Sequence, residues 1–233
     1  MDKKILAIIP ARGGSKGLKR KNIRALADKP LISYTIETAK TSKYLDRIIV
    51  STEDEEISSI SKEYGAEVPF LRPMELAEDA TPSIDPILHC LKWLEENQDY
   101  VPDYVCLLQC TSPLRTNSQI DEAIEEMLEK KAGSIVSVYE SDKSPYWMKK
   151  IENGKLKNFL DDNINFARRQ DIPKAYMLNG AIYICKTDLL IKNKGWYSKN
   201  TVPYIMDKIT SVDIDDIDDF RYVEYLMKEE YNV

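Results

Sequence analysis

The chain alternates short apolar runs with longer amphipathic stretches, and this alternation is what most constrains its fold. The apolar runs are rich in β-branched residues and occupy positions 5–9, 47–51, 104–108, 134–139 and 181–185. Stretches with a helical period lie between most of them, at positions 32–41, 55–64, 83–96 and 118–131. Near-continuous apolar strands separated by helices are typical of a mostly parallel sheet covered on both faces. We therefore expect an α/β fold that binds its ligands beyond the carboxyl ends of the strands.

A basic, glycine-rich segment directly follows the first apolar run; we call residues 11–24 the opening loop. The loop has six Lys or Arg residues and no Asp or Glu, although the net charge of the chain is −6. Gly13, Gly14 and Gly17 allow positive φ and let backbone N–H groups approach a ligand, as in an anion nest. The prediction is a polyphosphate site, and the alternative is a glycine-rich turn with a solvated basic rim.

Known phosphate-binding motifs do not describe the opening loop. It matches neither GxxxxGK[ST], the Walker A pattern, nor GxGxxG, the dinucleotide pattern. What remains is a backbone nest with Arg12, Lys16 and Lys21 as candidate phosphate ligands.

An acidic stretch near the end of the chain has the opposite charge. In an extended backbone Asp213 and Asp215 point the same way, so both carboxylates can reach one hard cation. Mg²⁺ prefers a few carboxylates together with phosphate oxygens and water, so the pair fits a metal site shared with a nucleotide. Asp216, Asp218 and Asp219 can instead cap the last helix, and the two roles are compatible.

Residues 109–115 follow the third apolar run and supply polar groups at the same predicted edge of the sheet. Gln109 can read a base or sugar edge, and Arg115 can hold a carboxylate or phosphate through its planar guanidinium. The alternative is a simple turn at Thr111 and Ser112.

Two further segments give a weaker indication of a functional role. Arg72 lies in a short extended piece and is a second candidate anion ligand. Residues 51–55 resemble a capping box at the start of the next helix, so no catalytic role is assigned to them.

Residues 140–177 break the alternation. Within them, Asn153 and Gly154 lie between two alternating segments and predict a type I′ hairpin. Aromatic residues on such an excursion favour an arm that packs against a second subunit; a hairpin folded back on its own domain is the alternative. We expect a single domain over residues 1–233, with 140–177 as an inserted dimerisation arm.

Composition narrows the function further. The four cysteines lack the spacing of a zinc site and are interpreted as reduced, buried thiols, and the single histidine, His89, as a packed one. An acidic chain with no basic stripe beyond the opening loop argues against nucleic acid as a partner. No apolar run reaches the ~18 residues of a membrane span, and the first residues do not resemble a secretory leader, so we expect a cytoplasmic protein that does not bind membranes.

Together these motifs resemble the acylneuraminate cytidylyltransferase (CMP-sialic acid synthetase) family, which activates nine-carbon keto sugars. The matching segments follow the family's order over nearly the whole chain: 9–17 with Lys21 and Asn22, 71–73 with Leu76, Ala77 and Asp79, 107–109 with 111–115, 168–170, 179–183, and 213–215 with Asp219 and Phe220. Cys110 stands where proline is usual, a departure that leaves Gln109 and Arg115 usable.

The resemblance implies a Rossmann-like nucleotidyltransferase fold, a homodimer, CTP as donor and Mg²⁺ as cofactor. It implies that CMP passes to the anomeric hydroxyl of a nonulosonic acid, giving a CMP-sugar and pyrophosphate. It also implies that the arm crosses to the other subunit and helps form its sugar site, with Arg169 near the sugar carboxylate.

The predicted site residues fall into three groups. The catalytic residues are Arg12, Lys21, Asp213 and Asp215, of which the two aspartates also hold the metal. The nucleotide-binding residues are Ala11, Arg12, Gly13, Gly14, Ser15, Lys16, Lys21, Asn22, Arg72, Ser83 and Arg115. The sugar-binding residues are Gln109, Arg169, Asn179 and Tyr183.

Alternatives remain for the function. One is a CMP-Kdo synthetase, acting on an eight-carbon acid, or another sugar nucleotidyltransferase with the same fold. Another is a nucleotide-binding dimer without catalysis, against which the presence of both the basic loop and the Asp213/Asp215 pair argues. Sialic, legionaminic and pseudaminic acids share the carboxylate and the anomeric centre, so the resemblance covers all three.

Overall fold

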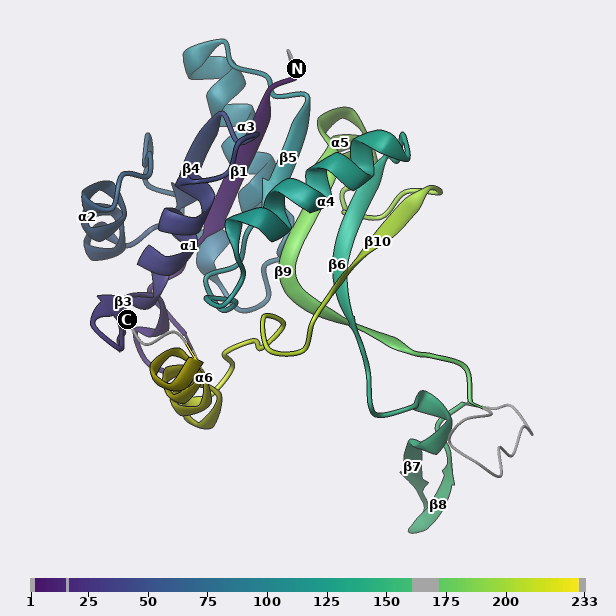
Figure 1. Ribbon diagram of the computed structural model, residues 1–233. Coiled ribbons are helices and arrows are strands. Elements are labelled where there is room, and N and C mark those ends of the chain that lie inside the picture. Colours follow the sequence, from purple (N-terminus) through teal and green to yellow (C-terminus); the bar gives the residue numbers. More distant parts are fainter. Residues whose placement is uncertain (1–2, 16, 161–171, 231–233) are drawn as a thin grey trace.

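A six-stranded sheet with the strand order β10-β6-β9-β5-β1-β4 forms the centre of the molecule (Figure 1). The computed structural model describes residues 3–15, 17–160 and 172–230. Strand β1 is parallel to β4 and β5, β6 is parallel to β10, and β9 runs antiparallel between β5 and β6. The strands are β1 (Ile5–Pro10), β4 (Arg47–Ser51), β5 (Tyr104–Leu107), β6 (Ser134–Glu140), β9 (Tyr176–Lys186) and β10 (Thr201–Met206). The predicted mostly parallel sheet is confirmed, although β10 was not among the predicted strands.

Helices cover both faces of this sheet. On one face lie α1 (Leu31–Lys40), α2 (Glu55–Glu63) and α4 (Asn117–Glu129), and on the other α3 (Asp85–Gln98) and α5 (Thr187–Asn193). The four predicted helices correspond to α1 to α4, whereas α5 was not predicted.

Strand β1 shows why the apolar runs are continuous. Ile5, Ala7 and Ile9 pack in the cluster beneath α1 and α4, whereas Leu6 and Ile8 pack in the cluster beneath α3. Successive side chains of a strand point to opposite faces, so a strand covered on both sides is apolar at every position.

The last helix, α6 (Ile217–Glu230), packs beside the opening loop rather than on the sheet. Its Phe220 and Val223 share an apolar cluster with Leu18, with Leu31 of α1, and with Leu26 in the short strand β2 (Ala25–Leu26), which pairs with β3 (Lys29–Pro30). This packing brings the acidic stretch before α6 next to the opening loop.

The predicted caps of α6 are confirmed for two of the three aspartates. Oδ1 of Asp216 accepts hydrogen bonds from the N–H groups of Asp218 and Asp219, at 2.8 and 3.1 Å. Oδ2 of Asp219 in turn accepts from the N–H groups of Asp215 and Asp216, at 2.9 and 3.1 Å. These bonds satisfy backbone donors at the helix start, so these two carboxylates have a structural role.

A hairpin follows β6, at a distance from the body of the molecule (Figure 1). It pairs β7 (Lys149–Glu152) with β8 (Lys155–Asn158) after a single 3₁₀ turn, η3 (Pro145–Trp147). Asn153 and Gly154 join the strands with φ of 52° and 73°, as a type I′ turn requires, and this confirms the predicted hairpin. Large apolar side chains are exposed on it, including Ile151 and Leu156.

Over the described residues, no helix has the length and apolar character needed to cross a membrane.

Candidate active site

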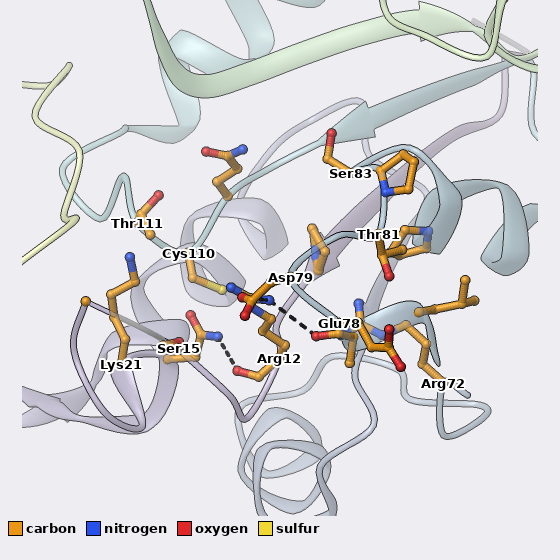
Figure 2. Close-up of a pocket in the computed structure, with 18 of the residues that line it drawn as sticks. Arg12, Ser15, Lys21, Arg72, Glu78, Asp79, Thr81, Ser83, Cys110 and Thr111 are labelled. Atoms are coloured by element: carbon orange, nitrogen blue, oxygen red, sulfur yellow. Dashed lines mark hydrogen bonds and ion pairs between the residues drawn. The ribbon is translucent and has the colours of Figure 1, made fainter. Parts of the chain in front are cut away.

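A cleft of about 480 Å³ opens at the carboxyl ends of β1 and β5. The residues lining it come from four segments that are distant in the sequence: the opening loop, the segment 72–86, the residues after β5, and the acidic stretch. Figure 2 shows labelled residues of the first three segments. Nine predicted site residues line it: Arg12, Ser15, Lys21, Asn22, Arg72, Ser83, Gln109, Asp213 and Asp215. This is the edge at which a parallel sheet binds its ligands, as predicted.

The side chain of Arg12 is held toward the wall of the cleft that residues 72–86 form. Its Nη1 lies 2.9 Å from Oδ1 of Asp79 and 3.3 Å from the carbonyl oxygen of Ala77, which ends the 3₁₀ turn η2 (Met74–Ala77). Asn22 donates from Nδ2 to the carbonyl oxygen of Arg12 at 2.9 Å and so braces the loop from below. About a third of the Arg12 side chain is exposed, so its guanidinium is accessible to a ligand.

Lys21 connects the opening loop with the acidic stretch. It begins the 3₁₀ turn η1 (Lys21–Ile23). Its Nζ donates to the carbonyl oxygen of Ile214 at 2.6 Å and lies 3.9 Å from Oδ1 of Asp215. Only 14% of its side chain is exposed, so this ammonium is fixed at the boundary between the basic and acidic walls.

Two glycines of the opening loop, Gly13 and Gly17, serve close contacts, whereas a Cβ atom on Gly14 would have no other atom within 4 Å. Neither Gly13 nor Gly14 has the positive φ that we expected. A Cβ atom on Gly13 would lie 2.5 Å from Oδ2 of Asp54, and one on Gly17 would collide with the carbonyl oxygen of Asp215. The expected nest is also partly occupied, because the N–H of Gly13 donates to Oε1 of Glu53 at 2.7 Å.

The two predicted metal ligands both line the cleft. Burial raises the pKa of Asp213, a hydrogen bond from Thr111 opposes this, and the Asp215 carboxylate raises it further. Oδ1 of Asp213 is buried and has no hydrogen-bond partner among the described residues. A carboxylate oxygen with this free capacity, beside a second carboxylate, suits a hard cation. Within the described ranges no group of three or more His, Cys, Asp or Glu side chains could hold a metal, so phosphate oxygens or water would have to complete the coordination.

Arg72 is buried in the wall opposite Lys21. Its side chain is 3% exposed and pairs with Glu53, whose Oε2 lies 2.6 Å from Nη2. Ser83 precedes α3 in the same wall and is exposed.

Gln109 lies where the sheet meets the cleft. A Cβ atom on Gly180 of β9, whose φ is +72°, would lie 2.5 Å from Oε1 of Gln109. Glycine at this position therefore leaves room for the Gln109 amide, and it lies where the pairing of β9 with β6 changes register, as at a β-bulge.

Arg115 does not reach the cleft. It is 2% exposed, and its Nη1 donates to the carbonyl oxygens of Ala181 and Gln109, at 2.8 and 3.3 Å. Burial lowers the pKa of Arg115 to about 10. The guanidinium ties the segment after β5 to β9, so its geometry does not support the predicted nucleotide contact.

Asn179 and Tyr183 are not brought to the cleft either. Asn179 is 3% exposed and bonds to two serines: its Oδ1 accepts from Ser137 at 2.6 Å, and its Nδ2 donates to Ser211 at 2.9 Å. The ring of Tyr183 packs 5.9 Å from the ring of Trp196, on the α3 side of the sheet. Their geometry favours structural roles over the predicted sugar contacts.

The remaining predicted residues have mixed positions. Ala11, Gly13 and Gly14 belong to the loop but do not line the cleft. Lys16 and Arg169 lie outside the described residues.

The cysteines are buried as predicted, and burial raises the pKa of Cys90, Cys106 and Cys110 to about 12 and that of Cys185 to about 11. His89 packs against the ring of Phe70 at 5.0 Å, which agrees with its interpretation as a packed histidine.

Several residues of segment 72–86 and of the segment after β5 line the cleft without having been predicted as site residues. Glu78, Asp79, Thr81, Pro82, Cys110 and Thr111 line the cleft, and Glu53 lies behind it. Segment 72–86 has neither a strand period nor a charge run, and what pointed to it in the sequence was the family resemblance, which includes Asp79. The cap of α2 is Asp54, which accepts from the N–H groups of Glu56 and Ile57, and not a capping box at residues 51–55.

Comparison with known proteins identifies the family. The cytidylyltransferase family profile matches residues 6–232. The chain is 38% identical to post-translational flagellin modification protein B of Campylobacter coli over 97% of this chain and 95% of that protein. It is 39% identical to the CMP-N,N'-diacetyllegionaminic acid synthase of Legionella pneumophila over 97% of each, and 39% identical to the N-acylneuraminate cytidylyltransferase of Escherichia coli over 95% of this chain and 51% of that protein.

A solved structure agrees on the fold. A CMP:2-keto-3-deoxy-manno-octonic acid synthetase complexed with CTP superposes with a TM-score of 0.74 at 17% identity, over 97% of this chain and 99% of that one. The central sheet and its helices thus have the same fold as that synthetase. With a family profile that spans almost its entire length and relatives near 38% identity, the chain belongs to the cytidylyltransferase family.

Proposed function

We propose that this protein transfers CMP from CTP to the anomeric hydroxyl of a nonulosonic acid, such as a sialic or legionaminic acid. The observation that carries the proposal is that opposite charges meet in one cleft, where Lys21 of the opening loop lies beside the Asp213/Asp215 pair. The relatives named for N-acylneuraminate and legionaminic acid activation support the choice of acceptor.

In the proposed reaction the anomeric oxygen attacks the α-phosphorus of CTP. A bond forms between these two atoms, the bond from the α-phosphorus to the bridging oxygen breaks, pyrophosphate leaves, and the proton of the hydroxyl passes to solvent water. Such a transfer depends on positioning and on neutralising charge more than on covalent protein chemistry. Arg12 and Lys21 are the half-buried cations of the cleft that can stabilise the charge on the transferred and departing phosphates.

We propose that Asp213 and Asp215 hold Mg²⁺ when the nucleotide is bound. The unpartnered, buried Oδ1 of Asp213 and the adjoining Asp215 carboxylate fit such an ion. Bound there, Mg²⁺ would neutralise negative charge on the phosphates. Lys21 keeps the backbone between the two aspartates in place through its bond to the carbonyl oxygen of Ile214.

Of the predicted sugar-binding residues, Gln109 lines the cleft, and we propose that it contacts the acceptor sugar. Its amide has both donors and an acceptor for sugar hydroxyls, and Gly180 leaves space beside it.

We propose further that the enzyme is a cytoplasmic homodimer joined through residues 140–177. The exposed side chains of Trp147, Ile151, Leu156 and Phe159 on this arm support an apolar contact with a second copy. Arg169 of the same arm stays a prediction for the acceptor carboxylate.

The test is pyrophosphate release, measured with each of the four nucleoside triphosphates and a panel of keto acids. We expect release with CTP and a nine-carbon acid, together with an equal amount of CMP-sugar. A preference for Kdo would favour the eight-carbon alternative. Tight CTP binding without turnover on any acid would favour the non-catalytic dimer.

A further inference from the structure

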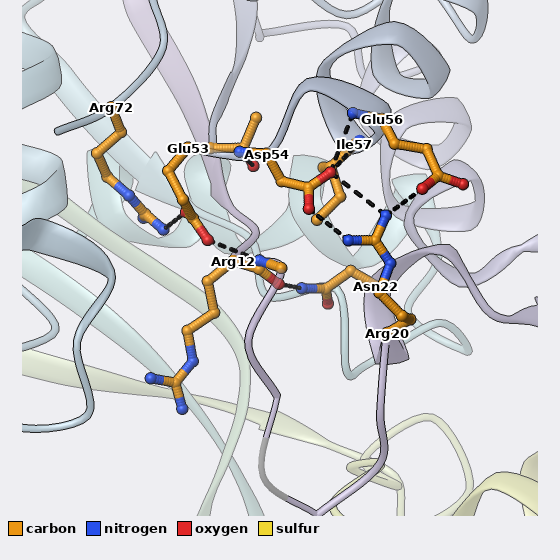
Figure 3. Close-up of polar contacts among 10 residues, drawn as sticks. Arg12, Arg20, Asn22, Glu53, Asp54, Glu56, Ile57 and Arg72 are labelled. Atoms are coloured by element: carbon orange, nitrogen blue, oxygen red, sulfur yellow. Dashed lines mark hydrogen bonds and ion pairs between the residues drawn. The ribbon is translucent and has the colours of Figure 1, made fainter. Parts of the chain in front are cut away.

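We propose that Glu53, which no motif assigned to the site, is a positioning residue that fixes both walls of the nucleotide cleft at once. Its carboxylate lies behind the cleft, in the turn between β4 and α2 (Figure 3). Oε1 accepts from the backbone N–H of Gly13 at 2.7 Å, and Oε2 accepts from Nη2 of Arg72 at 2.6 Å. The inference rests on the proposed function, since it concerns the binding of CTP.

Burial makes the contact with Arg72 specific. The side chains of Glu53 and Arg72 are 7% and 3% exposed. A buried ion pair is not a strong source of stability by itself, but removing one partner leaves the other as an unpaired buried charge. The guanidinium of Arg72, which lines the cleft, is therefore restricted to the orientation that Glu53 sets. A backbone bond from the Arg72 N–H to the carbonyl oxygen of Thr52, 2.8 Å long, holds the same two segments together.

The contact with Gly13 fixes the opening loop. Gly13 directly follows Arg12, so the bond from its N–H to Glu53 sets where the backbone of Arg12 lies. A Cβ atom on Gly13 would lie 2.5 Å from Oδ2 of Asp54, so the loop is pressed against the turn that contains Glu53. Figure 3 shows Arg12 and Arg72 on either side of this carboxylate.

One carboxylate thus positions two cations that belong to different walls. Its two oxygens are both used by protein donors, so Glu53 is occupied as an orienting group rather than as a ligand. A displacement of about 1 Å at a site that depends on positioning can cost roughly 100-fold in rate. Loss of this link is therefore expected to weaken nucleotide binding before it changes anything on the acceptor side.

The test compares the wild type with Glu53→Gln. CTP affinity is measured by calorimetry, the kinetic constants by pyrophosphate release, and stability by thermal unfolding, all at a temperature where each variant is folded. The amide oxygen of Gln can still accept from Gly13, but its NH₂ cannot accept from Arg72. We expect Kd and KM for CTP to rise about 10-fold or more, with KM for the acceptor within about twofold of the wild type.

A matched control separates positioning from stability. Asp121 is also a buried carboxylate, 5% exposed, and its Oδ1 also accepts from a side chain and a backbone N–H, those of Ser42 and Lys43. It does not line the cleft. Asp121→Asn is expected to lower the melting temperature and to leave the CTP constants unchanged.

A double variant keeps the test decisive if Glu53→Gln does not fold. Glu53→Gln with Arg72→Met leaves no unpaired buried charge. Because the two residues act through one contact, the fold-loss of CTP affinity in the double variant should be smaller than the product of the fold-losses in the two single variants. Where Glu53→Gln cannot be measured, the double variant should bind CTP within about threefold of Arg72→Met alone. Independent, multiplicative losses would overturn the inference. So would a Glu53→Gln protein that melts earlier but binds CTP like the wild type. A wild type that binds no CTP would overturn the proposed function and this inference together.

Discussion

The cleft and the buried cluster of Ser137, Asn179 and Ser211 both contain polar side chains, but these use their hydrogen-bonding groups differently. In the cleft, Arg12 is one-third exposed and Oδ1 of Asp213 has no hydrogen-bond partner among the described residues. In the cluster of Ser137, Asn179 and Ser211, by contrast, the side chains are buried, and the amide oxygen and nitrogen of Asn179 are both hydrogen-bonded to protein groups. Unused hydrogen-bonding capacity, rather than membership of a motif, separates side chains that can meet a ligand from those that hold the fold.

The largest expected effect tests the cleft side of this comparison. Asp213→Asn keeps the size of the side chain and the bond with Thr111 but removes a carboxylate from the proposed metal pair. We expect kcat to fall on the order of 100-fold or more, while thermal unfolding shows a folded protein of at least wild-type stability. Steady-state pyrophosphate release at several Mg²⁺ concentrations measures the effect. Wild-type activity at ordinary Mg²⁺ would remove Asp213 from the site.

Asp216→Asn is the control from the same acidic stretch. Asp216 caps α6, and hydrogen bonds from the N–H groups of Asp219 and Asp218 lower the pKa of its carboxyl group. Asparagine is nearly as good an N-cap as aspartate. Activity close to that of the wild type is expected, because this carboxylate does not line the cleft.

An intermediate effect is expected on the buried side. Asn179→Ala leaves the hydroxyls of Ser137 and Ser211 without their amide partner, at about 1–3 kcal/mol for a buried polar group left unsatisfied. Denaturant unfolding should show this loss of stability, with KM for the acceptor unchanged in the folded protein. Gln109→Ala, in the cleft, should do the reverse: a higher acceptor KM and little change in stability. An acceptor KM that rises in folded Asn179→Ala would restore Asn179 to the sugar site.

The same contrast explains how far the sequence reached. Periodicity predicted five strands and four helices, because strands such as β1 are buried on both faces and helices on one. The opening loop was predicted because positive charge clusters there although the net charge of the chain is −6. The Asp213/Asp215 pair was predicted because two carboxylates at this spacing point the same way in an extended backbone.

The direction in which a side chain points could not be predicted from periodicity and charge. Arg72 and Arg115 both follow apolar segments and look alike in the sequence, but only Arg72 has a carboxylate beside it and a place in the cleft wall. Arg115 instead donates to the carbonyl oxygen of Gln109 and to that of Ala181 on β9, which is 66 positions away in the chain. Contacts of this kind depend on the sheet order, which a local pattern does not contain.

The smallest expected effect concerns the ion pair across the mouth of the cleft, between Arg12 and Asp79. A triphosphate that binds Arg12 has to take the guanidinium from this carboxylate, 2.9 Å away. Both side chains are partly exposed, and such pairs contribute about 0–1 kcal/mol, so Asp79→Asn should tighten CTP binding by no more than about fivefold. Glu78→Gln makes the same change in charge at the neighbouring cleft position and is the control for a general electrostatic effect. Calorimetry on the two variants decides: a gain specific to Asp79→Asn supports competition for Arg12, whereas weaker binding would make Asp79 a contact of the nucleotide itself.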